Sequence, residues 1–117
     1  MISRPTSQPS WRLRLVSDPR AAAPDGRVSA FRALVSGRVQ GIGFRYSACR
    51  EAQRLGLVGW VRNMDSGDVE LWAEGENDSL TSFREWLEEG PPGAWIRAVD
   101  AEKHKPTGRY ATFSIEV

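Results

Sequence analysis

The sequence predicts a two-layer α+β sandwich, in which two helices cover one face of an antiparallel sheet. Several short segments alternate apolar and polar residues, which is typical of strands with one buried face. Two further segments carry apolar residues at helical spacing. The segments follow one another in the order β-α-β-β-α-β, with a short additional strand at the C-terminus. A length of 117 residues, of which 40% are hydrophobic and 26% charged, suits a single domain of this kind.

Residues 1–28 precede the first predicted strand and differ from the rest of the chain in composition. The first 27 residues contain five Arg and two Asp, a net charge of +3, together with four Pro. Because such a segment offers little apolar surface to bury, we expect a flexible basic N-terminal extension, followed by a domain over residues 29–117. A basic arm for an anionic partner and an Arg-rich targeting peptide are alternatives for this extension.

The first three elements surround a glycine-rich turn. Alternation over residues 30–36 predicts a strand, and the turn follows at once. A helix is predicted from Phe44, because apolar residues recur every three or four positions until Gly56 supplies a stop. The run 57–63 is rich in β-forming residues and predicts the second strand.

A hairpin connects the second and third strands. Residues 64–67 form a predicted turn, and residues 68–74 alternate cleanly between apolar and polar side chains. The polar set contains Glu70, Trp72 and Glu74. We therefore expect this hairpin to expose one face to water.

The last elements are a helix and two strands. Asn77 is the predicted N-cap of the helix, and the Gly-Pro-Pro-Gly run at residues 90–93 ends it. Residues 95–102 and 110–117 are predicted strands, the second because every other residue is apolar.

The glycine-rich turn is the candidate functional feature. Gly37, Gly41 and Gly43 have no Cβ, so the backbone can adopt positive φ angles and direct its N–H groups at one anion. The first N–H groups of the following helix add the positive end of its dipole, and Arg45 adds a guanidinium. Because the run matches neither common glycine-rich phosphate motif, a surface turn whose Arg45 only makes a salt bridge remains an alternative.

Three runs resemble a known family: GRVQGIGFR at residues 37–45, GWVRN at residues 59–63 and GDVE at residues 67–70. They resemble the acylphosphatase family, and the similarity covers about residues 30–117. The resemblance implies a ferredoxin-like βαββαβ sandwich with an additional short C-terminal strand. It also implies hydrolysis of the carboxyl–phosphate bond of acyl phosphates without a metal or an organic cofactor.

The resemblance further implies the site residues. Arg45, which ends the first motif, would bind the phosphate, and Asn63, which ends the second, would orient the attacking water. The phosphate-binding cradle would consist of Arg38, Val39, Gln40, Gly41, Ile42, Gly43, Phe44 and Arg45. An Asn side chain can donate and accept hydrogen bonds but cannot deprotonate water. We therefore expect the substrate's own phosphate to take the proton.

Other functions and sites are weaker candidates. A non-catalytic anion-binding module and an RNA-binding sandwich are the alternative functions, although Trp72 stands among acidic residues and so makes a poor platform for bases. The single His104 falls in a predicted solvated loop and is not expected to act as a general base. Cys49 is the only cysteine and predicts neither a disulfide nor a zinc site.

The same composition suggests where the protein acts and with what. No apolar run approaches the roughly 20 residues of a membrane span, and no secretory signal is recognisable. We expect a cytoplasmic monomer whose partners are a small acyl phosphate and phosphate ion, with no nucleic acid, membrane, metal or cofactor.

Overall fold

A computed structural model of the chain describes residues 27–117. The extension predicted over residues 1–28 therefore lies outside the described part, except for its last two residues. Val28, the last residue of the predicted extension, already belongs to the first strand. The elements are β1 Val28–Arg38, α3 Phe44–Arg54, β2 Val58–Asn63, β3 Val69–Glu76, α4 Asn77–Glu89, β4 Trp95–His104 and β5 Phe113–Glu116.

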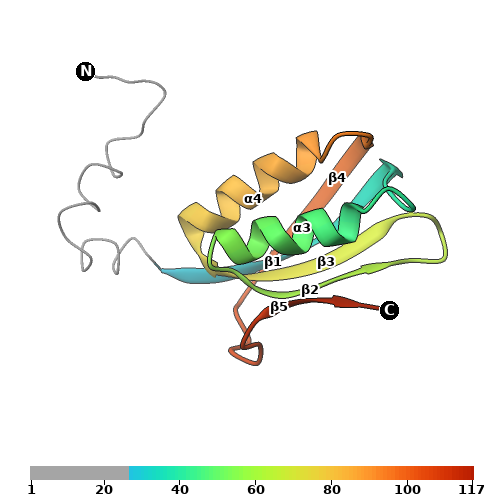
Figure 1. Cartoon of the computed structure of the whole chain (residues 1–117). Coiled ribbons are helices and arrows are strands. Elements are labelled where there is room, and N and C mark those ends of the chain that lie inside the picture. Colours follow the sequence, from blue (N-terminus) through green and yellow to red (C-terminus); the bar gives the residue numbers. More distant parts are fainter. Residues whose placement is uncertain (1–26) are drawn as a thin grey trace, which may run out of the picture.

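The strands form one sheet in the order β4-β1-β3-β2-β5, with both helices on the same face (Figure 1). Each helix connects two strands that are separated in the sheet by one other strand. The predicted two-layer, ferredoxin-like arrangement with an additional C-terminal strand is confirmed. The added strand β5 lies at the edge of the sheet and runs parallel to β2, whereas the other pairs are antiparallel.

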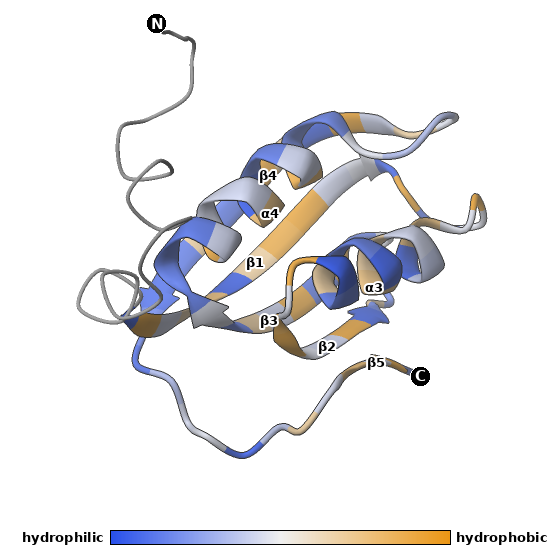
Figure 2. Cartoon of the chain, turned by 60° about the vertical axis from the view of Figure 1, so that its left-hand side comes forward, coloured by the Kyte–Doolittle hydropathy of each residue, from blue (hydrophilic) through white to orange (hydrophobic). Residues whose placement is uncertain are grey.

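The core lies between the helices and the sheet. Figure 2 shows hydrophobic residues in the middle of β1 beneath the helices, and hydrophilic residues on the outer surface of α4. Phe83 of α4 is fully buried and packs against Phe31 of β1 and Phe113 of β5, with ring centroids 6.2 and 5.8 Å apart. Phe44, the first residue of α3, is also buried. The start of α3 is thereby anchored in the core, which gives the adjoining glycine-rich turn a rigid base.

The expectation that the outer face of the hairpin is exposed to water is wrong for Glu70 and Glu74. Glu70 is only 5% exposed and Glu74 only 4%. Glu70 accepts hydrogen bonds from the Nε atoms of Arg32, at 2.6 Å, and Arg62, at 2.8 Å. The stems of these long side chains cover the carboxylate from the neighbouring strands, since β3 is the central strand of the sheet.

Glu74 is covered by the connection between β4 and β5, which crosses the outer face of the sheet (Figure 1). Its carboxylate accepts hydrogen bonds from the N–H and hydroxyl of Thr107, from the N–H of Gly108 and from Nε1 of Trp72. The buried charge is thus satisfied by four donors, as burial of a carboxylate requires.

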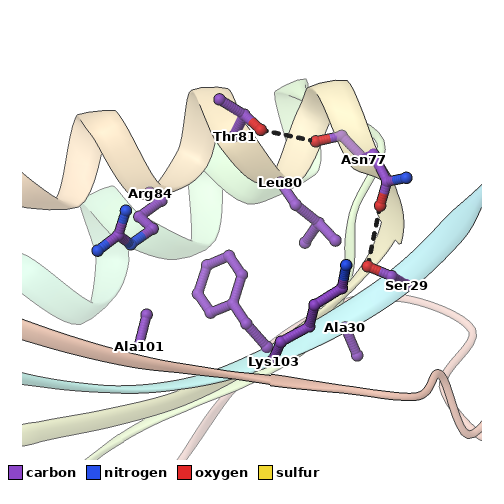
Figure 3. Close-up of a pocket in the computed structure, with 9 residues that line it drawn as sticks. Ser29, Ala30, Asn77, Leu80, Thr81, Arg84, Ala101 and Lys103 are labelled. Atoms are coloured by element: carbon purple, nitrogen blue, oxygen red, sulfur yellow. Dashed lines mark hydrogen bonds between the residues drawn. The ribbon is translucent and has the colours of Figure 1, made fainter.

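The prediction that Asn77 caps the second helix is also wrong. The cap position belongs to Glu76, and Asn77 is the first helical residue. Its Oδ1 instead accepts a hydrogen bond of 2.9 Å from Ser29 Oγ, which ties the start of α4 to β1 (Figure 3).

Two strand boundaries differ from the prediction. β4 continues to His104, so this residue ends a strand and does not lie in a loop. β5 is confined to Phe113–Glu116, and of its residues only Phe113 is buried. Because β5 is an edge strand, its other apolar residue, Ile115, stays 42% exposed. Within the described part of the chain, neither helix is long and apolar enough to cross a membrane.

Candidate active site

The glycine-rich turn leads into α3, whose N-terminus has no side-chain cap. Gly41 and Gly43 have φ angles of 80° and 78°, which favour glycine over other residues. Gly43 occupies the N-cap position of α3, where no side chain caps the helix and no acidic residue lies in the first turn. The first N–H groups of α3 therefore have no side-chain acceptor at the cap and no acidic residue in the same turn, which is the arrangement that binds anions.

Gln40 fastens the turn to the hairpin between β2 and β3. Its Nε2 donates to the backbone oxygens of Met64, at 2.8 Å, and Asp68, at 2.9 Å. Met64 directly follows Asn63, the last residue of β2. One side chain thus sets the spacing between the turn and Asn63.

A cavity of about 170 Å³ brings Arg45 and Asn63 together. It lies at the start of α3, between the turn, the end of β2 and the edge strand β5. Its lining residues are Val39, Gly41, Gly43, Phe44, Arg45, Tyr46, Asn63 and Ile115.

Arg45 lies in the first turn of α3 and is half-buried. Its Nη1 donates to the backbone oxygen of Glu116 in β5, over a long 3.4 Å. A guanidinium has five N–H donors, and this is its one hydrogen bond within residues 27–117. The remaining donors are available to an anion in the cavity.

Asn63 has an unsatisfied acceptor. Its Oδ1 is shielded from solvent and has no hydrogen-bond partner within the part of the chain that the structure describes. Leaving a buried polar atom unpaired costs roughly 1–3 kcal/mol, and such atoms are rare in native proteins. An acceptor of this kind beside a cavity is suited to the O–H group of a bound molecule.

The cavity includes some of the predicted cradle residues and leaves out others. Val39, Gly41, Gly43, Phe44 and Arg45 line it. The predicted residues Arg38, Gln40 and Ile42 are not among its lining residues.

The side chains of these three residues have other environments. Arg38 is exposed at the end of β1, Gln40 is engaged by the hairpin, and Ile42 is 37% exposed.

Two lining residues, Tyr46 and Ile115, were absent from the sequence prediction. Tyr46 directly follows Arg45 at the start of a predicted helix, so its proximity could have been inferred from the sequence. Ile115 comes from β5 at the far end of the chain. No local pattern links it to the turn, and only the parallel pairing of β5 with β2 brings it to the cavity.

The other sequence candidates lie elsewhere. His104 contacts Trp72 on the outer face, with ring centroids 5.0 Å apart, and its Nε2 lies 2.9 Å from Glu102. Cys49 is buried, and burial raises the pKa of its thiol, which disfavours the reactive thiolate. Among residues 27–117, no group of three or more His, Cys, Asp or Glu side chains could hold a metal ion.

Comparisons with known proteins identify the family of this chain. The acylphosphatase family profile matches residues 31–115. An acylphosphatase of Acaryochloris marina is 44% identical over 88 residues, which cover 75% of this chain and 94% of that protein. The structure of an acylphosphatase from Coxiella burnetii is similar with a TM-score of 0.70 and 42% identity, covering 76% of this chain and 93% of that one. The crystal structure of acylphosphatase from Bacillus subtilis is similar with a TM-score of 0.74 and 37% identity, covering 78% of this chain and 100% of that one. The chain therefore belongs to the acylphosphatase family.

Proposed function

We propose that this acylphosphatase-family hydrolase holds the phosphoryl group of an acyl phosphate in the cavity at the start of α3, with Arg45 and Asn63 as its catalytic residues. Arg45 binds the phosphate and Asn63 orients the attacking water. The products are a carboxylate and inorganic phosphate. The observation that carries this proposal is that one cavity joins an uncapped helix N-terminus, a guanidinium and the unpaired Oδ1 of Asn63.

The phosphoryl oxygens are held by preorganised donors. The N–H groups of the turn and of the first turn of α3 meet the oxygens, while Arg45 neutralises part of their charge. Each charge-assisted hydrogen bond contributes roughly 1.5–3 kcal/mol. Because the donors are in place before the substrate arrives, little reorganisation is needed as charge shifts during phosphoryl transfer.

The water is oriented by Asn63. Oδ1 accepts one O–H of the water, so that a lone pair of the water oxygen faces phosphorus. The bond between this oxygen and phosphorus forms while the bond from phosphorus to the acyl oxygen breaks, and the electron pair leaves with the carboxylate. The displaced water proton passes to a phosphoryl oxygen.

The lining of the cavity supports this route for the proton. Of the residues that line it in the described structure, none is a carboxylate or a histidine, and the only acid is the phenol of Tyr46. We therefore expect that, between about pH 4 and pH 7, the rate changes only with the ionisation of the substrate's own phosphate. A further break, at a pH that does not match the substrate's ionisation, would indicate a general base in the protein and contradict the proposed proton acceptor.

The assignment is tested by phosphate release from acetyl phosphate in the presence of a chelator. Arg45→Gln is expected to lower kcat/KM by at least about tenfold, and Asn63→Ala to lower kcat by a similar factor with little change in KM. Arg84→Gln, which alters a surface arginine of α4 outside the cavity, is the matched control and should leave both parameters unchanged. If neither Arg45→Gln nor Asn63→Ala slows turnover tenfold, the proposed roles are wrong.

Further measurements test the remaining expectations. We also propose that catalysis is metal-independent and that the protein is a cytoplasmic monomer without nucleic-acid or membrane partners. Turnover in the chelator tests the first point, and sedimentation tests the oligomeric state. Binding of inorganic phosphate without turnover would indicate a non-catalytic anion-binding module, and salt-sensitive RNA binding without turnover would indicate an RNA-binding domain.

A further inference from the structure

We propose that the groove between α3 and the C-terminal end of α4 receives the acyl part of the substrate, and that Arg50 selects acyl groups carrying a second negative charge. The inference rests on the proposed function, since it assumes that the phosphoryl group lies in the cavity at the start of α3. It assigns the half of the substrate that this small cavity does not hold.

The groove adjoins the phosphate cavity. Its volume is about 580 Å³, and Tyr46 lines both spaces. Tyr46 is 59% exposed, so its ring forms a shared wall between them that solvent reaches. A substrate whose phosphoryl group is held beside Tyr46 therefore has the groove as the adjacent space for its acyl group.

The position of the groove suits an in-line reaction. Asn63 lines the cavity from β2, in the sheet, whereas the residues that line the groove come from α3, from the end of α4 and from the turn after it. Both helices lie on one face of the sheet (Figure 1). In-line displacement places the leaving carboxylate on the opposite side of phosphorus from the water. The sheet side is thus assigned to the water and the helix side to the acyl group.

Two arginines line this groove, and of these Arg50 is the one whose guanidinium N–H groups donate no hydrogen bond within the described residues. Its guanidinium lies over the ring of Tyr46, 5.7 Å from the centroid, and makes no hydrogen bond or ion pair within residues 27–117. Arg54 also lines the groove, but Nε and Nη2 of its guanidinium bind the two carboxylate oxygens of Glu51. Arg50 follows Tyr46 by one helical turn, roughly 6 Å along α3. A second anionic group a few bonds beyond the acyl carbon would meet its fork of donors.

The opposite wall supplies shape and one opposing charge. Trp86 and Pro91 present apolar surface from α4 and the turn after it, which can contact the carbon chain of an acyl group. Glu89 is the carboxylate of this wall, and it would repel an anionic acyl group. The preference of the groove for an anionic acyl group therefore depends on the balance between attraction by Arg50 and repulsion by Glu89.

A second cavity cannot take this role. It has a volume of about 310 Å³ and lies on the other side of α4, above β1 and β4, with Leu80, Arg84 and Lys103 among its lining residues (Figure 3). It shares no lining residue with the phosphate cavity. An acyl group covalently attached to a phosphoryl group at the start of α3 does not reach it.

The test compares two acyl phosphates of equal chain length, butyryl phosphate and succinyl monophosphate, which differ by a terminal methyl group and a carboxylate. We expect the unaltered protein to favour succinyl monophosphate in kcat/KM by about tenfold. Arg50→Gln should remove this preference by lowering kcat/KM for succinyl monophosphate about tenfold, while that for butyryl phosphate stays within about twofold. Arg50→Lys keeps the charge but not the planar fork of donors, and should retain only part of the preference.

Two further variants complete the design. Glu89→Gln removes the opposing charge and should raise kcat/KM for succinyl monophosphate alone, and Arg84→Gln should change neither substrate. Inhibition by inorganic phosphate should be the same in Arg50→Gln as in the unaltered protein, because the phosphate cavity is untouched. Equal losses for both substrates in Arg50→Gln, or no preference in the unaltered protein, would overturn the acyl subsite. Full turnover in Arg45→Gln would instead overturn the proposed function.

Discussion

Two glutamates of the central strand are charged although they are buried. Burial alone raises the pKa of the Glu70 carboxyl, but the hydrogen bonds from Arg62 and Arg32 more than offset this, so the pKa lies below its usual range. The same holds for Glu74, where burial is opposed by hydrogen bonds from the hydroxyl and N–H of Thr107, from Trp72 and from Gly108. Both side chains therefore stay ionised in the folded protein at neutral pH.

These depressed pKa values predict acid-sensitive stability. A carboxyl whose pKa is lower folded than unfolded stabilises the protein above its unfolded pKa, about 4.3 for Glu, and loses this contribution as the pH falls through the folded pKa. We expect the free energy of unfolding, measured in urea, to be nearly constant from pH 7 to pH 5 and to fall steadily below about pH 4.

Replacing Glu70 measures its contribution to the free energy of unfolding. Glu70→Gln should lower the free energy of unfolding at pH 7 by about 1–2 kcal/mol, a value reduced because both arginine partners are partly exposed. The variant should then lose less stability than the unaltered protein between pH 5 and pH 3. Parallel pH profiles for the two proteins would show that Glu70 does not contribute in this way.

At the scale of elements, two glycines serve the fold for different reasons. Gly59 in β2 has a φ of 138°, and a Cβ there would lie 1.9 Å from the backbone oxygen of Trp72 in β3. Gly59 is therefore required because the backbones of β2 and β3 approach each other closely at this position. Gly41 has a positive φ, but a Cβ there would meet no atom within 4 Å, so only its backbone conformation favours glycine.

Alanine substitution separates the two cases. Gly41→Ala should cost about 1–2 kcal/mol of stability, the usual cost of a non-glycine residue at positive φ, and the protein should still fold. Gly59→Ala must push two paired strands apart and should cost at least about 3 kcal/mol, within the range of severe single substitutions. Urea denaturation measures both, and equal costs would contradict the steric role of Gly59.

Strand β5 links the outer face of the sheet to the candidate site. The connection before it is held by Glu74 through Thr107 and Gly108, and the strand then supplies Ile115 to the cavity and the backbone oxygen of Glu116 to Arg45. The alternation over residues 110–117 predicted a strand here, but it indicated neither its short length nor its neighbours.

For the whole molecule, residues 1–26 lie outside the acylphosphatase family profile, which matches residues 31–115. We expect a variant that begins at Arg27 to keep its melting temperature within about 2 °C and its kcat/KM for acetyl phosphate within about twofold. A loss of either would assign residues 1–26 a part in the domain.

The sequence by itself determined the order of helices and strands, because apolar periodicity specifies which face of each element is buried. Through its resemblance to the acylphosphatase family it also predicted Arg45 and Asn63 as site residues, and the structure brings both to one cavity. In both helices the buried residues include a set at helical spacing, Phe44, Ala48 and Ala52 in α3 and Leu80, Phe83 and Leu87 in α4.

Only the tertiary structure decided which distant segments meet. The burial of Glu70 and Glu74 depends on arginines from neighbouring strands and on a connection more than thirty residues further along the chain. The entry of Ile115 into the phosphate cavity and the groove beside Arg50 likewise arise where separate elements pack. Local periodicity describes one face of one element, whereas a site belongs to the space between elements, and that space exists only after the sheet and helices have assembled.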